Sequence, residues 1–262
     1  MRQSGNYIVH IFTIALLFLF GSVMRAQIVN VEAERIQTGA SGWTGSAKLG
    51  MNASKDVEGT MLLQTEAHLQ LKLDDHLFLL KGSTYFSKSG GETFSENSFL
   101  HFRYNYKVLD WLRWEAYTQA QKNQITGIDF RGLIGTGPRF KIMKDSNLAV
   151  YAAASYMLEH QNEQYPLIGI VHKNDHRVSS YISYTFKPTD AITLVHTAYY
   201  QPLLKSFSDY RISTDFSLSF AVTKALGFTL SYQALYDSDP VPGKPRFTYV
   251  LEDELQISFG GK

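Results

Sequence analysis

The chain is built from stretches of about ten or more residues in which apolar and polar side chains alternate. In the segment 63–73 apolar side chains occupy most odd positions, and in the segment 100–108 they occupy the even positions. A period of two residues is that of a β-strand, whose successive side chains point to opposite faces. A helical period would scatter the charged residues among the apolar ones. The pattern therefore predicts strands with one apolar face and one polar face.

The breaks between these segments are alternately short and long. Asp74-Asp75 and 187–190 are short, whereas 161–177 and 236–246 are long and polar. Tight turns at one end and longer loops at the other are typical of outer-membrane barrels, which have an even number of antiparallel strands. Counting the alternating segments predicts about twelve strands.

Strand length distinguishes a transmembrane barrel from a β-sandwich, the other class of all-β protein that fits this pattern. The predicted strands are long enough for a tilted membrane span of ~9–11 residues, whereas a sandwich strand is more often about 5–6 residues. We therefore expect an all-β, transmembrane, antiparallel up-and-down β-barrel of about twelve strands, with short periplasmic turns and longer extracellular loops. A periplasmic β-sandwich is the alternative.

The N-terminal residues have the pattern of a secretory signal. Arg2 is followed by an uncharged stretch, and the small residue Ala26 precedes the expected cleavage site. The most apolar part, 11–20, is shorter than the ~20 residues that a spanning helix needs, which favours cleavage over a membrane anchor. We expect a signal peptide over 1–26, a periplasmic segment over 27–40 and an outer-membrane barrel over 41–262.

Composition narrows the class further. The chain has no cysteine, which excludes a disulfide-stapled secreted domain and a lipid-anchored lipoprotein. Its net charge of +1 gives no attraction to nucleic acid. Aromatic residues make up 14% of the chain, which is rich for a soluble protein and suits a membrane barrel.

Aromatic residues on the apolar face cluster at the strand ends, as in the two interfacial girdles of a barrel. The expected partners are therefore outer-membrane lipid and, through the C-terminal strand, the barrel-assembly machinery. The girdle residues expected near the short turns are Trp43, Tyr106, Trp114, Phe140, Phe186, Phe220, Phe228 and Phe259. Those expected near the long loops are Phe86, Phe130, Tyr156, Tyr200 and Tyr236.

Charges of both signs occupy the polar face, which would line the lumen. Buried charges must pair because the desolvation cost would otherwise be severe. We expect ion pairs that largely fill the lumen, and a polar pathway for a small solute is the alternative. The predicted lumen-facing charged ladder is Glu66, His68, Arg103, Arg113, Glu115, Arg131, Arg139, Lys141 and Glu159.

Three segments resemble the domain of unknown function 481 family: GWTGSAKLGMNASKD at 42–56, FLHFRYNYKVLDWLRWEAYTQAQKN at 99–123 and DFRGLIGTGPRFKI at 129–142. The segment 26–43 resembles the start of the versions found in Bacteroidota-type bacteria. Members of the family are outer-membrane β-barrels, some of them labelled salt-induced outer-membrane proteins. The resemblance implies this fold and location; the family has no established activity, so it implies no functional residues.

Two short stretches resemble ligand sites without a diagnostic spacing. The glycine-rich run 131–139 lacks the helix that a nucleotide cradle needs, and we expect its glycines to leave room at a crowded wall. His172, Asp175 and His176 lie close together in the longest expected loop, but a solvated polar loop is favoured over a metal site. We expect no cofactor and no metal.

Two residues fit the barrel badly, because His196 and Asp253 fall on the lipid face. A charged group on that face costs up to ~2–4 kcal/mol for Arg or Lys at mid-bilayer and less for Asp, so we expect a bulge or a different register at these positions. His196 is also the histidine on which an outer-membrane lipid hydrolase would depend, with Thr189 and Asp190 upstream. We expect no enzyme, but a structural envelope component or a narrow pore. The alternatives are a surface binding protein acting through its extracellular loops and, less favoured, a lipid hydrolase.

Overall fold

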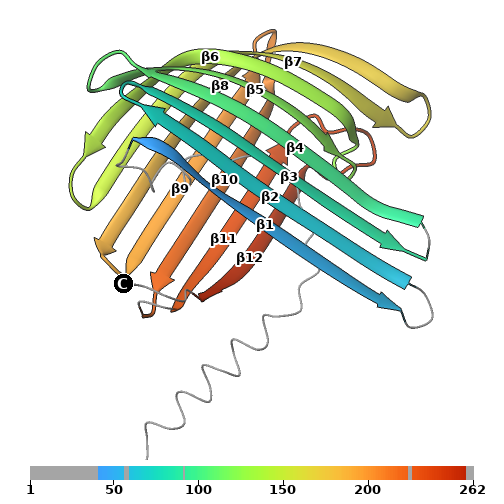
Figure 1. Ribbon diagram of the computed structural model, residues 1–262. Helices are drawn as coiled ribbons and strands as arrows, with labels where there is room; N and C mark the ends of the chain where they lie inside the picture. Colours follow the sequence, from blue (N-terminus) through green and yellow to red (C-terminus); the bar gives the residue numbers. More distant parts are fainter. Residues whose placement is uncertain (1–40, 56–58, 91, 224–225, 258–262) are drawn as a thin grey trace, which may run out of the picture.

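The computed structural model describes residues 41–55, 59–90, 92–223 and 226–257. Within them the chain forms twelve β-strands of 11 to 21 residues. The strands, labelled in Figure 1, are β1 Gly42–Lys55, β2 Gly59–Leu73, β3 His76–Ser89, β4 Glu92–Lys107, β5 Leu112–Asn123, β6 Ile128–Lys144, β7 Leu148–Tyr165, β8 Gly169–Thr189, β9 Ile192–Leu203, β10 Ser206–Ala221, β11 Leu226–Asp237 and β12 Phe247–Ile257.

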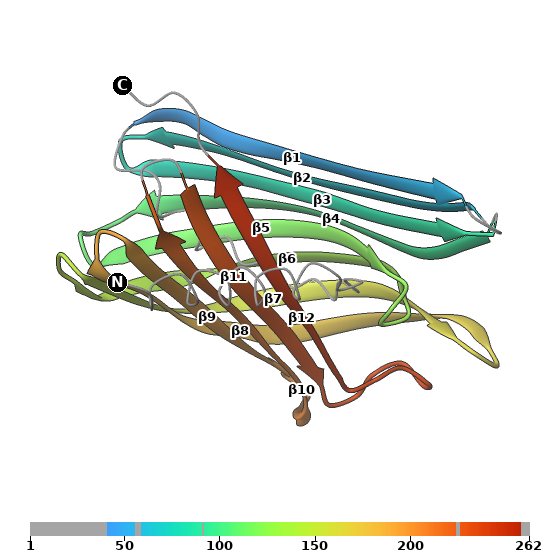
Figure 2. The same cartoon turned by 90° about the horizontal axis from the view of Figure 1, so that it is seen from below.

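Each strand pairs antiparallel with its neighbours in sequence, so the order in the sheet runs directly from β1 to β12. The sheet curls round a central space, as the two views in Figures 1 and 2 show. Parallel pairing would need crossovers of a dozen or more residues, and the connections here are too short for that. The predicted all-β, antiparallel up-and-down barrel of about twelve strands is confirmed.

The alternation of side chains places one set inside the barrel and the other outside. In β5, Glu115, Tyr117 and Gln121 are buried, whereas Trp114 and Thr118 on the opposite face are exposed. The exposed face carries the apolar residues and the buried face carries the polar ones, which is the reverse of a soluble protein. Among the residues described, no helix is long and apolar enough to cross a membrane.

The segment 161–177, which was expected to be the longest loop, is strand. The ladder between β7 and β8 continues to the pair Tyr165↔Gly169, and only 166–168 connect the two strands. The expectation of a loop here is wrong, because backbone pairing continues where both faces have become polar and the apolar signal has faded. The connection 238–246 between β11 and β12 does remain long and irregular.

The two edges of the sheet, β1 and β12, lie at a steep angle to each other in both views (Figures 1 and 2). The strand pairings of the described residues include none between these two strands. Lys48 Nζ on β1 nevertheless lies 2.8 Å from Glu254 Oε2 on β12, and both side chains are more than half exposed. Within the described residues, this ion pair connects β1 to β12, and no backbone hydrogen-bond ladder does so.

The register at His196 is regular, contrary to the bulge or shift that we expected. His196 pairs with Tyr184 on one side and Phe216 on the other, and its Nε2 lies 2.7 Å from Thr214 Oγ1. Its ring is flanked by both aromatic rings, with centroids 5.2 and 6.3 Å away. Asp253 also sits in a regular ladder and is exposed. A hydroxyl partner and two aromatic neighbours let His196 remain on the apolar face.

Two glycines of the run 131–139 are required by close packing. A Cβ atom on Gly135 would lie 2.3 Å from the ring of Tyr117, and one on Gly137 would lie 2.2 Å from the carbonyl oxygen of Ala154. The first glycine makes room for a tyrosine inside the barrel, and the second lets β7 approach β6. Both observations agree with the crowded wall expected from the sequence.

Candidate functional site

The interior of the barrel is the candidate site, and its centre is the carboxylate of Glu159 on β7. This side chain is completely buried and contacts three guanidinium groups. Arg211 Nη1 donates to Glu159 Oε1 at 2.8 Å, Arg177 Nε lies 3.4 Å from the same oxygen, and Arg131 binds the other oxygen. The three arginines come from β10, β8 and β6, so a single carboxylate ties four strands together across the lumen.

A second cluster surrounds Glu115 on β5. Its carboxylate lies 3.6 Å from Arg103 Nη1 and 3.6 Å from Arg139 Nε, and it accepts a hydrogen bond from the hydroxyl of Tyr181 at 3.0 Å. Arg139 also donates to that hydroxyl at 3.0 Å and stacks over the ring of Tyr151, 3.7 Å from its centroid. These contacts fix the planar guanidinium group of Arg139 in one orientation.

Positive and negative charges balance among the buried residues of the described chain. Five arginines and five carboxylates are each no more than 9% exposed, so the middle of the lumen has no excess of either sign. They are Arg103, Arg131, Arg139, Arg177 and Arg211, with Glu115, Glu159, Glu163, Asp175 and Asp215.

Apolar and aromatic side chains fill much of the remaining interior. Tyr117, Leu133 and Met157 form one buried cluster, and Tyr181 packs against Tyr199 in another. Two cavities in this part of the barrel have volumes of about 50 and 30 Å³, which is room for a few water molecules each.

The connection 238–246 lies against the barrel at the end away from the short turns. Val241 in this segment is 3% exposed and lies beside the turn at Gly127, where an added Cβ atom would be 3.2 Å from Val241 Cγ1. Lys244 Nζ donates to the carbonyl oxygen of Gln124 in the same turn at 2.9 Å. Pro240 and Val241 also line the cavity of about 30 Å³. This connection narrows that end of the lumen.

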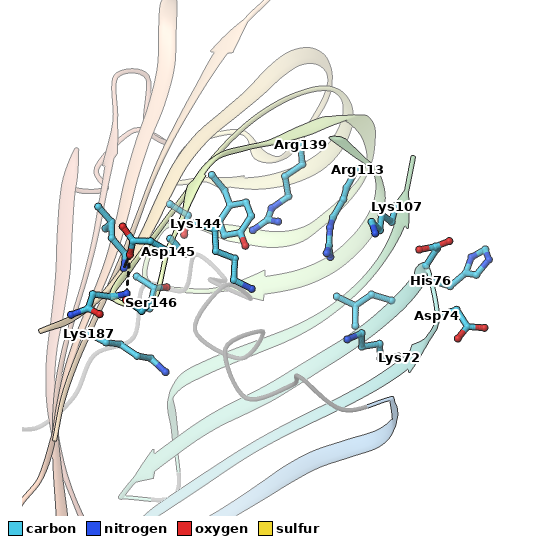
Figure 3. A pocket seen from close by; sticks show the side chains of 18 residues that line it. Lys72, Asp74, His76, Lys107, Arg113, Arg139, Lys144, Asp145, Ser146 and Lys187 are labelled. Atoms are coloured by element: carbon cyan, nitrogen blue, oxygen red, sulfur yellow. Dashed lines mark hydrogen bonds between the residues drawn. The ribbon is translucent and has the colours of Figure 1, made fainter. Parts of the chain in front are cut away.

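The other end of the barrel opens into a cavity of about 570 Å³, drawn in Figure 3. Its walls are formed by residues of β2 to β8 and of the short turns between them. In one of these turns the backbone N–H groups of Leu148 and Asn147 donate to the Asp145 carboxylate at 2.7 and 2.8 Å. These hydrogen bonds hold the pKa of Asp145 below its ordinary value.

Comparison with known proteins then identifies the family. Residues 47–259 match the family described as "Protein of unknown function, DUF481". The chain belongs to the DUF481 family. The resemblance seen in the segments 42–56, 99–123 and 129–142 is thereby confirmed.

Three solved structures resemble this DUF481 chain at low identity. The NanC porin has a TM-score of 0.47 and 11% identity, with 81% of this chain and 99% of that chain covered. The KdgM porin has a TM-score of 0.41 and 14% identity, with coverage of 82% and 100%. The translocator domain of the autotransporter NalP from Neisseria meningitidis has a TM-score of 0.45 and 10% identity, with coverage of 97% and 98%. No curated protein gave a match to this chain.

The structure places the predicted charged ladder of this DUF481 protein in two groups. His68, Arg103, Glu115, Arg131, Arg139 and Glu159 are buried, whereas Glu66, Arg113 and Lys141 are partly exposed. Sequence reasoning missed Arg177 and Asp175, because both fell in a segment expected to be a loop. It also left Arg211 out of the ladder, although the alternation of polar and apolar residues over 211–222 puts that residue on the polar face.

The predicted girdle aromatics near the short turns differ in exposure. Trp43, Tyr106, Trp114 and Phe186 are between 41% and 66% exposed, and Phe140, Phe220 and Phe228 are partly exposed. At the other end Phe130, Tyr156 and Tyr200 are exposed, and Phe86 and Tyr236 are partly exposed. Phe259, the predicted signal peptide over 1–26 and the segment 27–40 lie outside the described residues.

The structure does not bring His172, Asp175 and His176 of β8 together. Asp175 is buried, whereas His172 and His176 are exposed on the other side of the strand and lie close to Asn162 Oδ1 and the Tyr156 hydroxyl. In the part of the chain that is described, no group of three or more potential ligands could hold a metal ion. His196 is one of several outward-facing histidines, since His172 and His176 are exposed too.

Proposed function

We propose that this protein is an outer-membrane β-barrel with a closed lumen, which serves as a structural component of the envelope and not as an open pore. The outer face supports the membrane location. Large apolar side chains on separate strands are exposed there, among them Leu100 and Phe102 on β4, Ile134 on β6, Ile182 on β8 and Leu251 on β12. A surface of this kind marks contact with a membrane or another protein.

The observation that best supports a closed lumen is the fully buried Glu159 with its three arginine partners. They cross the interior between β7, β6, β8 and β10, and the cavity beside Arg131 has a volume of only about 50 Å³. The connection containing Val241 narrows the lumen further. Twelve strands lie between small barrels filled with side chains and the ~16–18-stranded porins that hold an aqueous channel.

Conductance in planar bilayers tests this proposal. We expect little or no steady current from the purified wild-type barrel, although the unheated protein should run faster than the boiled protein on a detergent gel and fractionate with outer membranes. The gel establishes that the sample is folded, so a silent bilayer cannot be attributed to unfolded protein. A large, stable conductance from such a sample would establish a narrow pore instead.

The long connection 238–246 lies at the end of the barrel opposite the short turns 74–75, 145–147 and 190–191, and it suggests the orientation. We propose that these turns and both chain ends face the periplasm, and that the barrel-assembly machinery recognises the C-terminal strand. Tags inserted in the turn 166–168 should then be labelled on intact cells, whereas tags at 145–147 should be labelled only after the cells are opened. Labelling in the opposite pattern would reverse the orientation.

Surface recognition is a second candidate function, favoured by the tip of the β7–β8 hairpin. Leu167 and Ile168 in this turn are 96% and 71% exposed, and Ile170 beside them is 49% exposed. Exposed apolar side chains at the end of a long projecting hairpin suit a protein partner. Leu167→Ser with Ile168→Ser should then abolish partner capture on intact cells without changing the melting temperature of the barrel.

We also propose that the protein is not a lipid hydrolase. His196 has the hydroxyl of Thr214 as its neighbour at 2.7 Å, and two aromatic rings flank it. These contacts suit a structural histidine. Hydrolysis of a phospholipid by the purified barrel, abolished by His196→Ala while the gel mobility survives, would overturn this assignment.

A further inference from the structure

The first residues of β8, next to the β7–β8 turn, form an open edge of the sheet. β8 pairs with β7 from Gly169 onward, but its ladder with β9 begins only at Arg177. β9 ends at Leu203, and the chain then turns into β10. Within the described chain, residues 169–175 therefore have a paired strand on one side only, and we call them the free edge of β8. In Figures 1 and 2 this hairpin, drawn in yellow, projects past the turns beside it.

Every second residue of the free edge directs its backbone N–H and C=O away from β7. Where the edge ends, the carbonyl oxygen of His176 accepts a hydrogen bond from the N–H of Leu204 at 2.8 Å. Successive residues of an antiparallel strand point their backbone groups to alternate sides, so Ile170, His172 and Asn174 point to the same side as His176. Among the described residues, none forms a backbone hydrogen bond to these three on that side. The free edge therefore offers a row of main-chain donors and acceptors to a further strand.

The free edge lies beyond the apolar belt of the barrel. On the outer face of the hairpin, His172 Nδ1 lies 2.6 Å from Asn162 Oδ1, and His160 Nδ1 lies 2.8 Å from Asn174 Oδ1. Farther along β8 the same face carries Ile182, which is 51% exposed. A bare backbone edge cannot lie in hydrocarbon, because no water is present there to satisfy its polar groups. The polar pairs therefore indicate that the free edge meets water and not lipid.

The free edge lacks the features that usually protect an exposed strand. Native sheets blunt such edges with outward charges, proline or bulges. The free edge contains no proline, and its ladder with β7 has no bulge. Its two charged residues face the inside of the barrel: Lys173 lies 2.9 Å from Glu163. Asp175 lies 3.6 Å from Arg177 and 3.5 Å from Lys205. The outer face of the edge therefore presents no charge that would repel a further strand.

We propose that the free edge of β8 binds an extended segment of another protein, which adds to the sheet as a further strand. This gives the binding mode of the surface recognition proposed above, and it rests on that function. The segment continues the β8 ladder where β9 leaves it, and main-chain hydrogen bonds supply most of its affinity. Apolar side chains lie at both ends of the edge, since Ile170 is 49% and Leu204 is 40% exposed. A segment of about seven residues with an apolar residue near each end fits this edge.

A second copy of this chain fits the free edge less well than a separate segment does. Two barrels in one membrane have the same orientation, so their β8 strands could meet only in parallel or at an angle. Parallel pairing is slightly less stable per residue than antiparallel pairing. A separate extended segment can enter from either end, and it can therefore pair antiparallel with β8.

Amide hydrogen exchange of the full-length barrel in detergent micelles, read for single residues by NMR, tests whether the edge is open. The N–H groups of Ile170, His172 and Asn174 should exchange at least tenfold faster than those of Val171 and Lys173, which face β7. Equal protection of all five would show that this chain or a second copy already covers the edge. That result would overturn the proposal.

A designed peptide serves as the binding probe. It has nine residues, a leucine at each end and alternating threonine and valine between them, and it carries a fluorescent label. The peptide should raise its anisotropy on binding to the folded barrel and slow the exchange of the three edge amides. The same peptide with every backbone nitrogen methylated cannot donate hydrogen bonds and should not bind. Equal binding of both peptides, or no binding of the first, would overturn the proposal.

A matched pair of variants separates the backbone from the side chain. Asn174→Pro removes one donor from the free edge and should weaken probe binding by roughly five- to tenfold. Asn174→Ala loses the same side-chain contact with His160 but keeps the backbone N–H, so it should bind the probe almost as well as the wild type. Equal losses in the two variants would attribute binding to the side chain and overturn strand addition. The mobility of the unheated proteins on a detergent gel establishes that both variants are folded.

The variants at the hairpin tip separate this inference from the proposed surface recognition. If Leu167→Ser with Ile168→Ser abolishes partner capture on intact cells and Asn174→Pro does not, the partner binds the tip and the free edge is not its site. That outcome would overturn this inference and leave surface recognition standing. Wild-type cells that capture no partner, although the purified barrel binds the probe through its free edge, would do the reverse.

Discussion

Replacing Glu159 with glutamine should destabilise the barrel strongly, because it removes the charge on which three buried arginines converge. Glu159→Gln keeps the shape of the side chain and most of its packing. It leaves the guanidinium groups of Arg131, Arg177 and Arg211 in the same buried space without their common carboxylate. The variant therefore tests charge and leaves volume almost unchanged.

The structure sets the size of the effect. Breaking a buried ion pair by removing one partner costs about 3–5 kcal/mol. Two of the three arginines would still have another acidic partner in the variant. Arg177 Nη2 lies 3.0 Å from Asp209, and Arg211 Nε lies 2.9 Å from Asp237. We therefore expect the lower end, about 3 kcal/mol. For a protein of this size that corresponds to a fall of roughly 6–12 °C in melting temperature.

The assay is the temperature at which half of the protein changes from the fast band to the slow band on a detergent gel. Glu96→Gln is the matched control, since Glu96 pairs with Lys122 at 3.0 Å but both side chains are about a third exposed. An exposed pair contributes about 0–1 kcal/mol, so the control should fall by at most a few degrees. If Glu159→Gln melts no lower than the control, the central network does not hold the barrel together.

Three further predictions use the same gel or the bilayer assay. Glu115→Ala should lower the melting temperature more than Arg113→Ala, because Glu115 is buried between two arginines whereas Arg113 is partly exposed at the cavity. The reverse order would contradict the conclusion that Glu115 is the centre of a second buried ion-pair cluster. Val241→Asp should release the connection 238–246 and increase transient current through the barrel, while an unchanged current would place the constriction deeper. Lys48→Cys with Glu254→Cys should be joined by a short bismaleimide reagent in the folded barrel and not after boiling, which tests the approach of β1 to β12.

The sequence predicts the strands and their faces because both depend on local alternation. A period of two assigns Arg103 and Glu115 to the same side of the wall as soon as a strand is assumed. The same reasoning predicts the twelve-stranded order, since short connections permit only antiparallel neighbours. None of this requires knowledge of contacts between distant residues.

The contacts inside the barrel could not be predicted in the same way. Glu159 binds Arg211, which lies 52 residues later in the chain and three strands away, and only the curvature of the sheet brings the two side chains together. Arg177 was missed because the apolar face weakens in the polar end of β8 although backbone pairing continues. The position of Val241 beside the turn at Gly127 depends on how an irregular segment folds back, for which alternation gives no signal.

The charged interior also specifies which way each strand faces. A slip of one residue in β8 or β10 would turn Arg177 or Arg211 toward the apolar surface, at a cost of ~2–4 kcal/mol for each arginine near mid-bilayer. An interior filled only with apolar side chains would impose no such cost, because either face of a strand could then meet lipid. Buried ion pairs often add little net stability, so specification of register is the more consistent reason for this number of them. The Glu159→Gln variant tests this directly. If Glu159 helps to fix the register of the strands, the fast band of the variant should broaden into several species before it melts. A single sharp band with a lower melting temperature would show that Glu159 contributes to stability and not to the choice of register.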